Sequence, residues 1–285
     1  MLHSILGDVP ITRQQGERLN LPARSRWSPF LKRCALLLSA NESYQRAEAD
    51  LATLTGVTVS HSTLQRLVQR EPWAYPMLEG QMTEMSLDGG MIRVRTPVGE
   101  PSEWREYKAL QVADQLSLAC FKDNAQIIDW AGQQPWAEAV SCLGDGHDGV
   151  WGIYHAMGRD KQRVEVLDWY HLMENLAKVS GTPAQLEAVK AFLWQGQVEA
   201  ARRYLYQHKV GHSEGFRAYL KKHQRRIPNY EARQQAGASI GSGRVESLVK
   251  QIAARVKLSG AQWSTQNVPK VLHLRCAYLN GAFAA

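Results

Sequence analysis

The chain has 285 residues, of which 44% are hydrophobic, so it can form a catalytic domain, one or two smaller modules and a substantial core. Its 34 lysines and arginines outnumber its 27 aspartates and glutamates. The resulting net charge of +7 favours a polyanionic partner, nucleic acid before acidic membrane. Four widely spaced cysteines with no C-x-x-C pair exclude a disulfide framework and a zinc ribbon.

The sequence also predicts where the protein is found. No apolar run is long enough to span a bilayer, and the N-terminus lacks the pattern of a secretory signal. We therefore expect a cytoplasmic, nucleoid-associated protein with reduced thiols and no membrane contact.

The N-terminal quarter contains two different kinds of segment. Residues 1–27 show little hydrophobic periodicity, and we expect an extended, basic lead-in. Residues 28–72 are expected to form three helices. The first begins after a cap at Ser28, the second covers about 43–54 and the third covers 60–70.

The short link TGVTVS between the second and third of these helices is typical of a helix-turn-helix. In that motif the second helix enters the major groove of DNA, so Gln65 and Arg66 would face the bases. A plain three-helix bundle or a dimerisation element would show the same pattern. We take a DNA-binding module as the working interpretation.

After a break at Pro72 to Pro76, residues 80–168 have the alternating pattern of an α/β domain. Its elements are expected at Glu84–Arg95, Arg105–Ala113 and Leu116–Phe121 (strands), about 125–140 (helix), 141–146 (a short buried strand) and, after another helix, Arg163–Leu167 (strand). Residues 169–235 show only helical periodicity and predict an all-helical domain. Residues 236–285 add two helices, near 244–257 and 266–280, that complete the core.

Two aspartates lie where expected strands meet glycine. Asp88 is inside a strand before Gly89, and Asp145 ends a strand before Gly146. A carboxylate in such a position is open to a ligand, but Asp-Gly is also a common turn pair.

A third acid, Glu246, is the only one after Glu231, in a tail rich in lysine and arginine. An ion pair with Lys250 on the same helix face would explain it simply, at a few tenths of a kcal/mol. Alternatively, Glu246 is a metal ligand among phosphate-binding cations. Carboxylates suit Mg²⁺, and two ions about 3.5–4 Å apart can stabilise an in-line phosphoryl displacement.

The order of these acids and four segments resemble a known family. The order of the acids looks like that of DDE transposases, and the resemblance covers the chain from about Trp27 to its end. It is carried by the segments LGDGHDGVW, VLDWYHLMENLAKV, GSGRVESLVKQIAARVK and LSGAQWS. They are most similar to bacterial insertion-sequence transposases of the ISKra group, which are relatives of the Mutator-like elements. The resemblance implies an RNase H-like core with two Mg²⁺ or Mn²⁺ ions on Asp88, Asp145 and Glu246. Asp168 and His171 resemble the D-x-x-H signature, near the active site but outside the triad.

Basic residues mark the expected DNA contacts. Eight lysines or arginines between Arg202 and Arg226 alternate with aromatic residues, which suits phosphate contacts and base stacking, although a solvated helix face would look similar. The side chains expected to touch DNA here and in the C-terminal tail are Lys221, Lys222, Arg225, Arg226, Arg244, Lys250 and Lys257.

The resemblance and the charge predict one function. We expect cleavage at the ends of a DNA transposon and strand transfer into target double-stranded DNA, by a homo-oligomer. The alternatives are an RNase H-like nuclease that only cuts, and a truncated or domesticated element that acts as a DNA-binding regulator.

Overall fold

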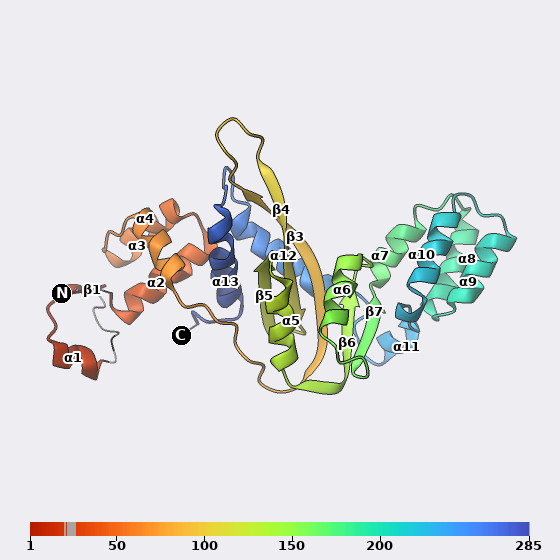
Figure 1. Ribbon diagram of the computed structural model, residues 1–285, viewed down its shortest axis with the longest axis horizontal. Helices are drawn as coiled ribbons and strands as arrows, with labels where there is room; N and C mark the ends of the chain where they lie inside the picture. The colour runs from red at the N-terminus through yellow and green to blue at the C-terminus, as the bar shows by residue number, and fades with distance from the viewer. Residues whose placement is uncertain (20, 22–26, 285) are drawn as a thin grey trace.

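The computed structural model describes residues 1–19, 21 and 27–284. Figure 1 shows three parts in a row: a small helical module near the N-terminus, a central sheet with helices on both faces, and a second helical domain at the far end. The C-terminal helix α13 (Val268–Leu279) lies between the N-terminal module and the sheet. The mixed α/β class predicted from the sequence is confirmed.

The first part of the chain differs from the expected extended lead-in. Strands β1 (Leu2–Ser4) and β2 (Gly7–Val9) form a hairpin, and helix α1 (Arg13–Arg18) follows. Gly7 adopts a φ of +92°, which a turn this tight requires. Thr12 and Gln15 form a reciprocal capping box at the start of α1, a local signal that the periodicity argument overlooked. The part of the predicted lead-in at residues 20 and 22–26 lies outside the described residues.

The three predicted helices of the N-terminal module are confirmed: α2 (Pro29–Asn41), α3 (Tyr44–Thr55) and α4 (His61–Arg70). Ser28 and Ser43 cap α2 and α3 by accepting a backbone N–H three residues on, and Gly56 ends α3 in the left-handed conformation. The inward faces of the three helices share one apolar cluster around Leu31 and Leu64.

The central sheet has the strand order β5-β4-β3-β6-β7. β3, β4 and β5 are antiparallel, whereas β6 and β7 run parallel to β3. The strands are β3 (Met82–Val94), β4 (Glu103–Val112), β5 (Leu116–Phe121), β6 (Trp136–Gly144) and β7 (Arg163–Leu167).

Helices cover both faces of this sheet. On one face, α5 (Asn124–Gln133) and α6 (Asp148–Ala156) pack against Leu87 and Leu110. On the other, α12 (Gly243–Val256) and α13 pack against Ile92 and Ala109. Since side chains alternate along a strand, Asp88 points to the same face as Ile92, toward α12.

One predicted boundary in this domain is wrong. The helix expected to reach residue 140 ends at Gln133, and 136–140 belong to β6. Pro135 is the physical reason. Proline disfavours helical backbone in the residue before it, and Gln134 is accordingly extended, with a ψ of 154°.

The segment from Trp169 to Gln235 is helical, as predicted. It contains α7 (Trp169–Leu176), α8 (Pro183–Trp194), α9 (Val198–Gln207), α10 (Glu214–Lys222), the 3₁₀ turn η1 (Gln224–Arg226) and α11 (Tyr230–Gln235). The rings of Trp169, Trp194 and Tyr230 pack together at its base, with the two tryptophan centroids 4.9 Å apart. Trp194 is therefore a packing residue.

Candidate active site

The topology brings Asp88 and Asp145 to the same level of the sheet. Asp88 lies inside β3, and Asp145 directly follows β6, the parallel neighbour of β3. Ser86 pairs with Leu143, and Asp88 and Asp145 each follow this pair by two residues, close enough for their charges to interact. These two acids are 57 residues apart in the sequence, and the parallel pairing of β3 with β6 brings them to the same part of the sheet.

Glu246 comes from the helix that covers this part of the sheet. It lies in the first turn of α12, whose buried residues Val245 and Leu248 share a core with the face of β3 that carries Asp88. The Tyr107 hydroxyl of β4 donates to the carbonyl of Val249 at 3.4 Å and links sheet and helix next to the acid.

The glycines beside Asp88 have a steric role. A Cβ on Gly89 would lie 2.4 Å from the Glu106 Oε1, and one on Gly90 would lie 2.2 Å from the ring of Tyr107. The pair therefore allows side chains of β4 to cross over β3. Because Asp88 lies inside a continuous strand, the alternative of an Asp-Gly turn fails for it.

Asp145, by contrast, does shape a turn. Its Oδ1 accepts the backbone N–H of His147 at 2.8 Å, and Gly146 has a φ of +98°. A Cβ on Gly146 would lie 2.6 Å from the hydroxyl of Tyr219. Among the described residues the other Asp145 oxygen, Oδ2, accepts no hydrogen bond and is available for a ligand.

The charges of these acids act on one another. The pKa of Asp88 is raised, first by burial and then by the charges of Asp145 and Glu246, although the backbone N–H of Gly89 opposes this shift. Like charges held this close favour a bound cation.

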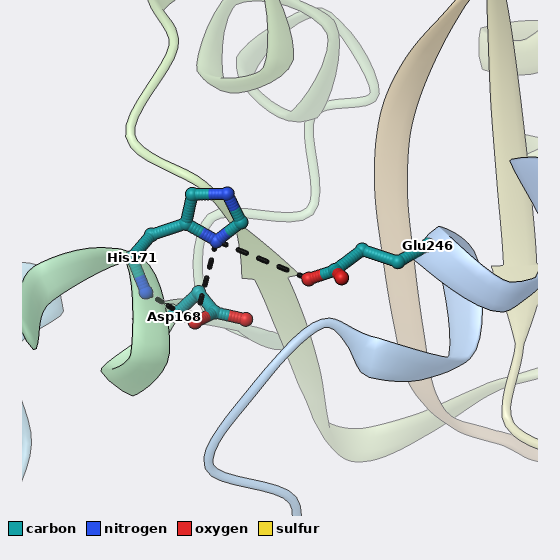
Figure 2. Close-up of side chains that lie close together, drawn as sticks. All are labelled: Asp168, His171 and Glu246. Atoms are coloured by element: carbon teal, nitrogen blue, oxygen red, sulfur yellow. Dashed lines mark hydrogen bonds and ion pairs between the residues drawn. The ribbon is translucent and has the colours of Figure 1, made fainter. Parts of the chain in front are cut away.

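A second grouping of possible ligands adjoins the first. One ligand atom each from Asp168, His171 and Glu246 lies within 4.8 Å of the others, so these three residues could hold a metal ion. Figure 2 shows His171 between the two carboxylates, with its Nδ1 3.5 Å from Asp168 Oδ1 and 3.9 Å from Glu246 Oε1. Among the described residues it is the only such grouping this close. The predicted set of Asp88, Asp145 and Glu246, which shares only Glu246 with it, is not brought within that distance.

Asp168 is the least available ligand of this grouping. It is fully buried, and its Oδ1 accepts the backbone N–H of His171 at 2.9 Å. Its Oδ2 accepts both the backbone N–H of Ser242 and, at 2.7 Å, the Ser242 hydroxyl. Burial alone would raise the pKa of Asp168, but the bonds from His171 and Ser242 lower it to about 2. Asp168 therefore joins the start of α7 to the residue that precedes α12.

His171 is held as a cation by the same partner. The interaction with Asp168 is the largest cause that raises the pKa of His171, to about 9, and the charges of Glu174 and Asp145 add to it. Its imidazolium faces Glu246 from α7.

An open pocket connects part of this site to solvent, and neither Asp145 nor Asp168 belongs to its lining. Its lining includes Asp88, His171, Glu174, Glu246 and Lys250. Glu246 and Lys250 both line this pocket, and these two described residues form no ion pair with each other. The alternative that Glu246 serves a salt bridge to Lys250 on the helix surface is therefore wrong.

Three of the predicted DNA contacts have partners within the protein. Arg226 pairs with Glu165 at 2.6 Å, Lys222 pairs with Asp148 at 2.6 Å, and Arg244 bonds to Asp114 at 2.8 Å and also to Glu84. Arg226 also stacks over Trp151, with its Cζ 4.3 Å from the ring centroid.

The other predicted contacts lie nearer the surface. Exposed side chains are Arg66, Lys221, Arg225, Lys250 and Lys257, the last with its Nζ 5.5 Å from the Trp104 ring. Gln65 is half-buried and lines a second pocket beside α4.

Two residues at the site were missed by the sequence analysis. Lys108 lies opposite Gly89 in the sheet, almost buried, with its Nζ 2.7 Å from Glu106 Oε1. Tyr219 of α10 places its hydroxyl beside Gly146, and burial, followed by the charges of Asp145 and Asp168, raises its pKa to about 12. The alternation of β4 predicts that Lys108 points to one face, but nothing local places Tyr219 beside Asp145.

No family model matches the sequence, and no curated protein matches it. Among the helices of the described residues, none is both long and apolar enough to cross a membrane.

Proposed function

We propose that this chain is a DDE transposase whose central sheet and flanking helices form an RNase H-like core. The observation that carries the proposal is that the charges of three acids from distant elements act on one another: Asp88 in β3, Asp145 after the parallel neighbour β6, and Glu246 in the helix packed on the face of β3 that carries Asp88. The raised pKa of Asp88 supports their proximity, because the charges of the other two acids contribute to it.

The donor set suits the cofactor that this reaction uses. Carboxylate oxygens are the ligands that Mg²⁺ and Mn²⁺ prefer, and Asp88, Asp145 and Glu246 would hold two such ions. Bound there, the ions would stabilise the charge on the attacking and leaving oxygens of a phosphodiester. Asp168 would keep His171 and the start of α12 in place through its bonds to His171 and Ser242.

The reaction proposed has two steps at this one site. Attack by water breaks the P–O3′ bond at an element end and leaves a 3′-hydroxyl and a 5′-phosphate. That 3′-hydroxyl then attacks a phosphodiester of target DNA, and the target strand leaves through its own 3′-oxygen. The protein forms no covalent bond to DNA, so the acids need only hold the metal ions and position the oxygens.

The outer parts of the chain would bind the DNA. In α4, Leu64 and Val68 are buried while Ser62 and Arg66 are exposed, as a groove-reading helix of a helix-turn-helix requires. The exposed Lys221 and Arg225 at the end of the helical domain would contact phosphates. Cleavage at two element ends favours a homo-oligomer on double-stranded DNA.

Plasmid cleavage tests the proposal. The purified chain should nick DNA with Mg²⁺ or Mn²⁺ but not with Ca²⁺, because the chemistry requires tight octahedral coordination. Asp88→Asn and Glu246→Gln should abolish nicking while the fold, checked by circular dichroism, is retained. Asp114→Asn, in an exposed carboxylate that pairs with Arg244, is the control and should cut normally.

Three outcomes would contradict this reading. Cleavage that persists with a chelator would rule out the metal mechanism. Cleavage by Glu246→Gln near the wild-type rate would remove Glu246 from the ligand set. Nicking without strand transfer, when pre-cut ends are supplied, would favour a nuclease that only cuts.

A further inference from the structure

A second pocket lies where the N-terminal helical module meets the C-terminal helices. It has a volume of about 330 Å³ and shares no lining residue with the pocket at Asp88 and Glu246. Much of its wall is the segment 258–264, LSGAQWS, which has no part in the proposed reaction. The rest comes from Ser43, Tyr44, Gln65, Arg95, Arg255 and Asn267.

The polar groups of this pocket suit an anion. Two arginines line it, Arg95, which directly follows β3, and Arg255 from α12, and its lining contains no aspartate or glutamate. Serine hydroxyls and the amides of Gln65 and Asn267 add hydrogen-bond donors. Guanidinium and hydroxyl donors without a competing carboxylate are the chemistry that proteins use to hold phosphate.

Arg255 provides independent evidence for a missing partner. It is only 1% exposed, lies between the rings of Tyr44 and Trp263, and donates from Nε to the carbonyl of Ser39 at 2.8 Å. Its Nη2 is buried and has no hydrogen-bond partner among the described residues. Burying a cation with an unused donor is costly, and an anion in the pocket would reduce that cost.

The nearest competing explanation is an acidic residue of the protein itself. Glu42 is close enough to influence the pKa of Arg255, but the two side chains form no ion pair, and Glu42 pairs with Arg46 at 3.7 Å. Glu42 is not part of the pocket lining, so the pocket side of Arg255 faces no acid.

The place of the pocket indicates the source of the anion. Gln65 lines it from α4, and Arg66, the next residue of that helix, is exposed. A DNA strand held by α4 would therefore pass close to the pocket mouth. We propose that this pocket binds a backbone phosphate of that strand, so that segment 258–264 is a phosphate-binding loop joining the helical module to the catalytic core. This inference rests on the proposed DNA binding.

Two pairs of matched variants test it. Arg95→Gln removes a pocket cation, and its control is Arg105→Gln, an exposed arginine paired with Glu103 outside the pocket. Gln262→Glu adds a charge to the pocket, and its control is Gln266→Glu, which is exposed and outside it. All four should retain the wild-type circular dichroism spectrum.

The measurement is the dissociation constant of a fluorescein-labelled DNA duplex by anisotropy, over a range of salt concentrations. Each pocket variant should bind about tenfold more weakly than wild type. Arg95→Gln removes a charged hydrogen bond to the phosphate, whereas Gln262→Glu places a negative charge beside it. Arg95→Gln should also reduce the salt slope by roughly one unit, because one phosphate of the duplex is no longer neutralised. The controls should stay within about twofold of wild type.

The outcomes separate this inference from the proposed function. If the wild type binds and cuts DNA but pocket and control variants behave alike, the phosphate loop is overturned and the transposase proposal stands. If the wild type binds no DNA, the proposed function fails, and calorimetric titration with inorganic phosphate decides the pocket. Phosphate binding that Arg95→Gln abolishes would support the anion pocket with a free phosphate compound as its ligand. An absence of phosphate binding would overturn it.

Discussion

Replacing Asp168 by asparagine would test whether one buried carboxylate holds the base of the candidate active site together. Asp168 is fully buried and accepts hydrogen bonds from His171 and from two groups of Ser242. Asparagine has the same shape, but its amide nitrogen cannot accept. At least one donor, on Ser242 or on His171, is then left buried without an acceptor.

The size of the effect follows from these bonds. A hydrogen bond to a charged group contributes about 1.5–3 kcal/mol, and leaving a buried donor unpaired costs about 1–3 kcal/mol. The pKa of Asp168, held at about 2 against an ordinary 3.8, independently corresponds to about 2 kcal/mol of stabilisation at neutral pH. We therefore expect Asp168→Asn to lower the free energy of unfolding by about 3 kcal/mol. In a chain of this length that lowers the melting temperature by roughly 5–10 °C.

The pH dependence gives a second readout of the same interaction. Because the folded-state pKa of Asp168 is lowered, its stabilisation is present above about pH 4 and is lost as pH falls toward 2. Because the pKa of His171 is raised to about 9, its share is present below about pH 6.5 and is lost as pH rises through 9. Both shifts report one interaction, so their energies are not added, and Asp168→Asn should flatten the profile at both ends.

Calorimetric melting between pH 3 and 10 measures both effects. Asp148→Asn is the control, because Asp148 is an exposed carboxylate that pairs with Lys222 on the surface, and it should melt near the wild-type temperature. A variant at Asp168 with the melting temperature and pH profile of wild type would refute the reasoning, because the three hydrogen bonds would then contribute nothing.

Three further results are expected. Gly90→Ala should lower the free energy of unfolding by about 1–3 kcal/mol in urea titration, since its Cβ would lie 2.2 Å from the buried ring of Tyr107. The control Gly152→Ala, which has open space around it in α6, should be neutral or stabilising. Asp88→Asn should raise the melting temperature of the metal-free protein at neutral pH, because burial and two neighbouring acids disfavour the charge; a lower melting temperature would contradict the clustering of the acids. Lys221→Gln should reduce the salt slope of DNA binding by roughly 0.9, because Lys221 is exposed and free to contact a phosphate. Arg226→Gln should leave that slope unchanged and lower the free energy of unfolding by about 3 kcal/mol, because Glu165 loses a partner in a mostly buried pair. The reverse pattern would show that Arg226 is the phosphate contact.

Much of the fold could be predicted because its signals are local. The cap at Ser28 marks the start of α2, and the bounds of β5 and β7 agree with the predicted Leu116–Phe121 and Arg163–Leu167. The predictions failed where periodicity was given more weight than a local signal. Helical periodicity predicts a helix to residue 140, but Pro135 ends it at Gln133. The lack of periodicity in residues 1–27 predicts an extended segment, but the capping box at Thr12 starts a helix there.

The site could be predicted only in part, because long-range contacts assemble it. Asp88 and Asp145 stand out in the sequence because each precedes glycine at a strand. The bond from Ser242 to Asp168, by contrast, joins residues 74 positions apart, and no spacing rule predicts it. Tyr219 is one of the aromatic residues interleaved with the basic segment 202–226, and nothing in α10 indicates that its hydroxyl lies beside the loop that holds Asp145.

A long helical segment separates Asp145 from Glu246 in the sequence, and the contacts at its base explain how Glu246 can still be held beside the sheet. Asp168, just after β7, bonds to Ser242, just before α12, and the backbone N–H of Trp169 donates to Ile240 at 2.9 Å. The two ends of the segment are thus fastened to each other where it leaves and rejoins the sheet. Its interior can then vary in length while Glu246, one turn beyond Ser242, keeps its position on the helix that packs against β3. The same fastening predicts that Ser242→Ala, which removes one donor and no charge, reduces DNA cleavage more than DNA binding. Equal losses in both would mean that the fastening supports the helical domain as a whole and not the position of Glu246.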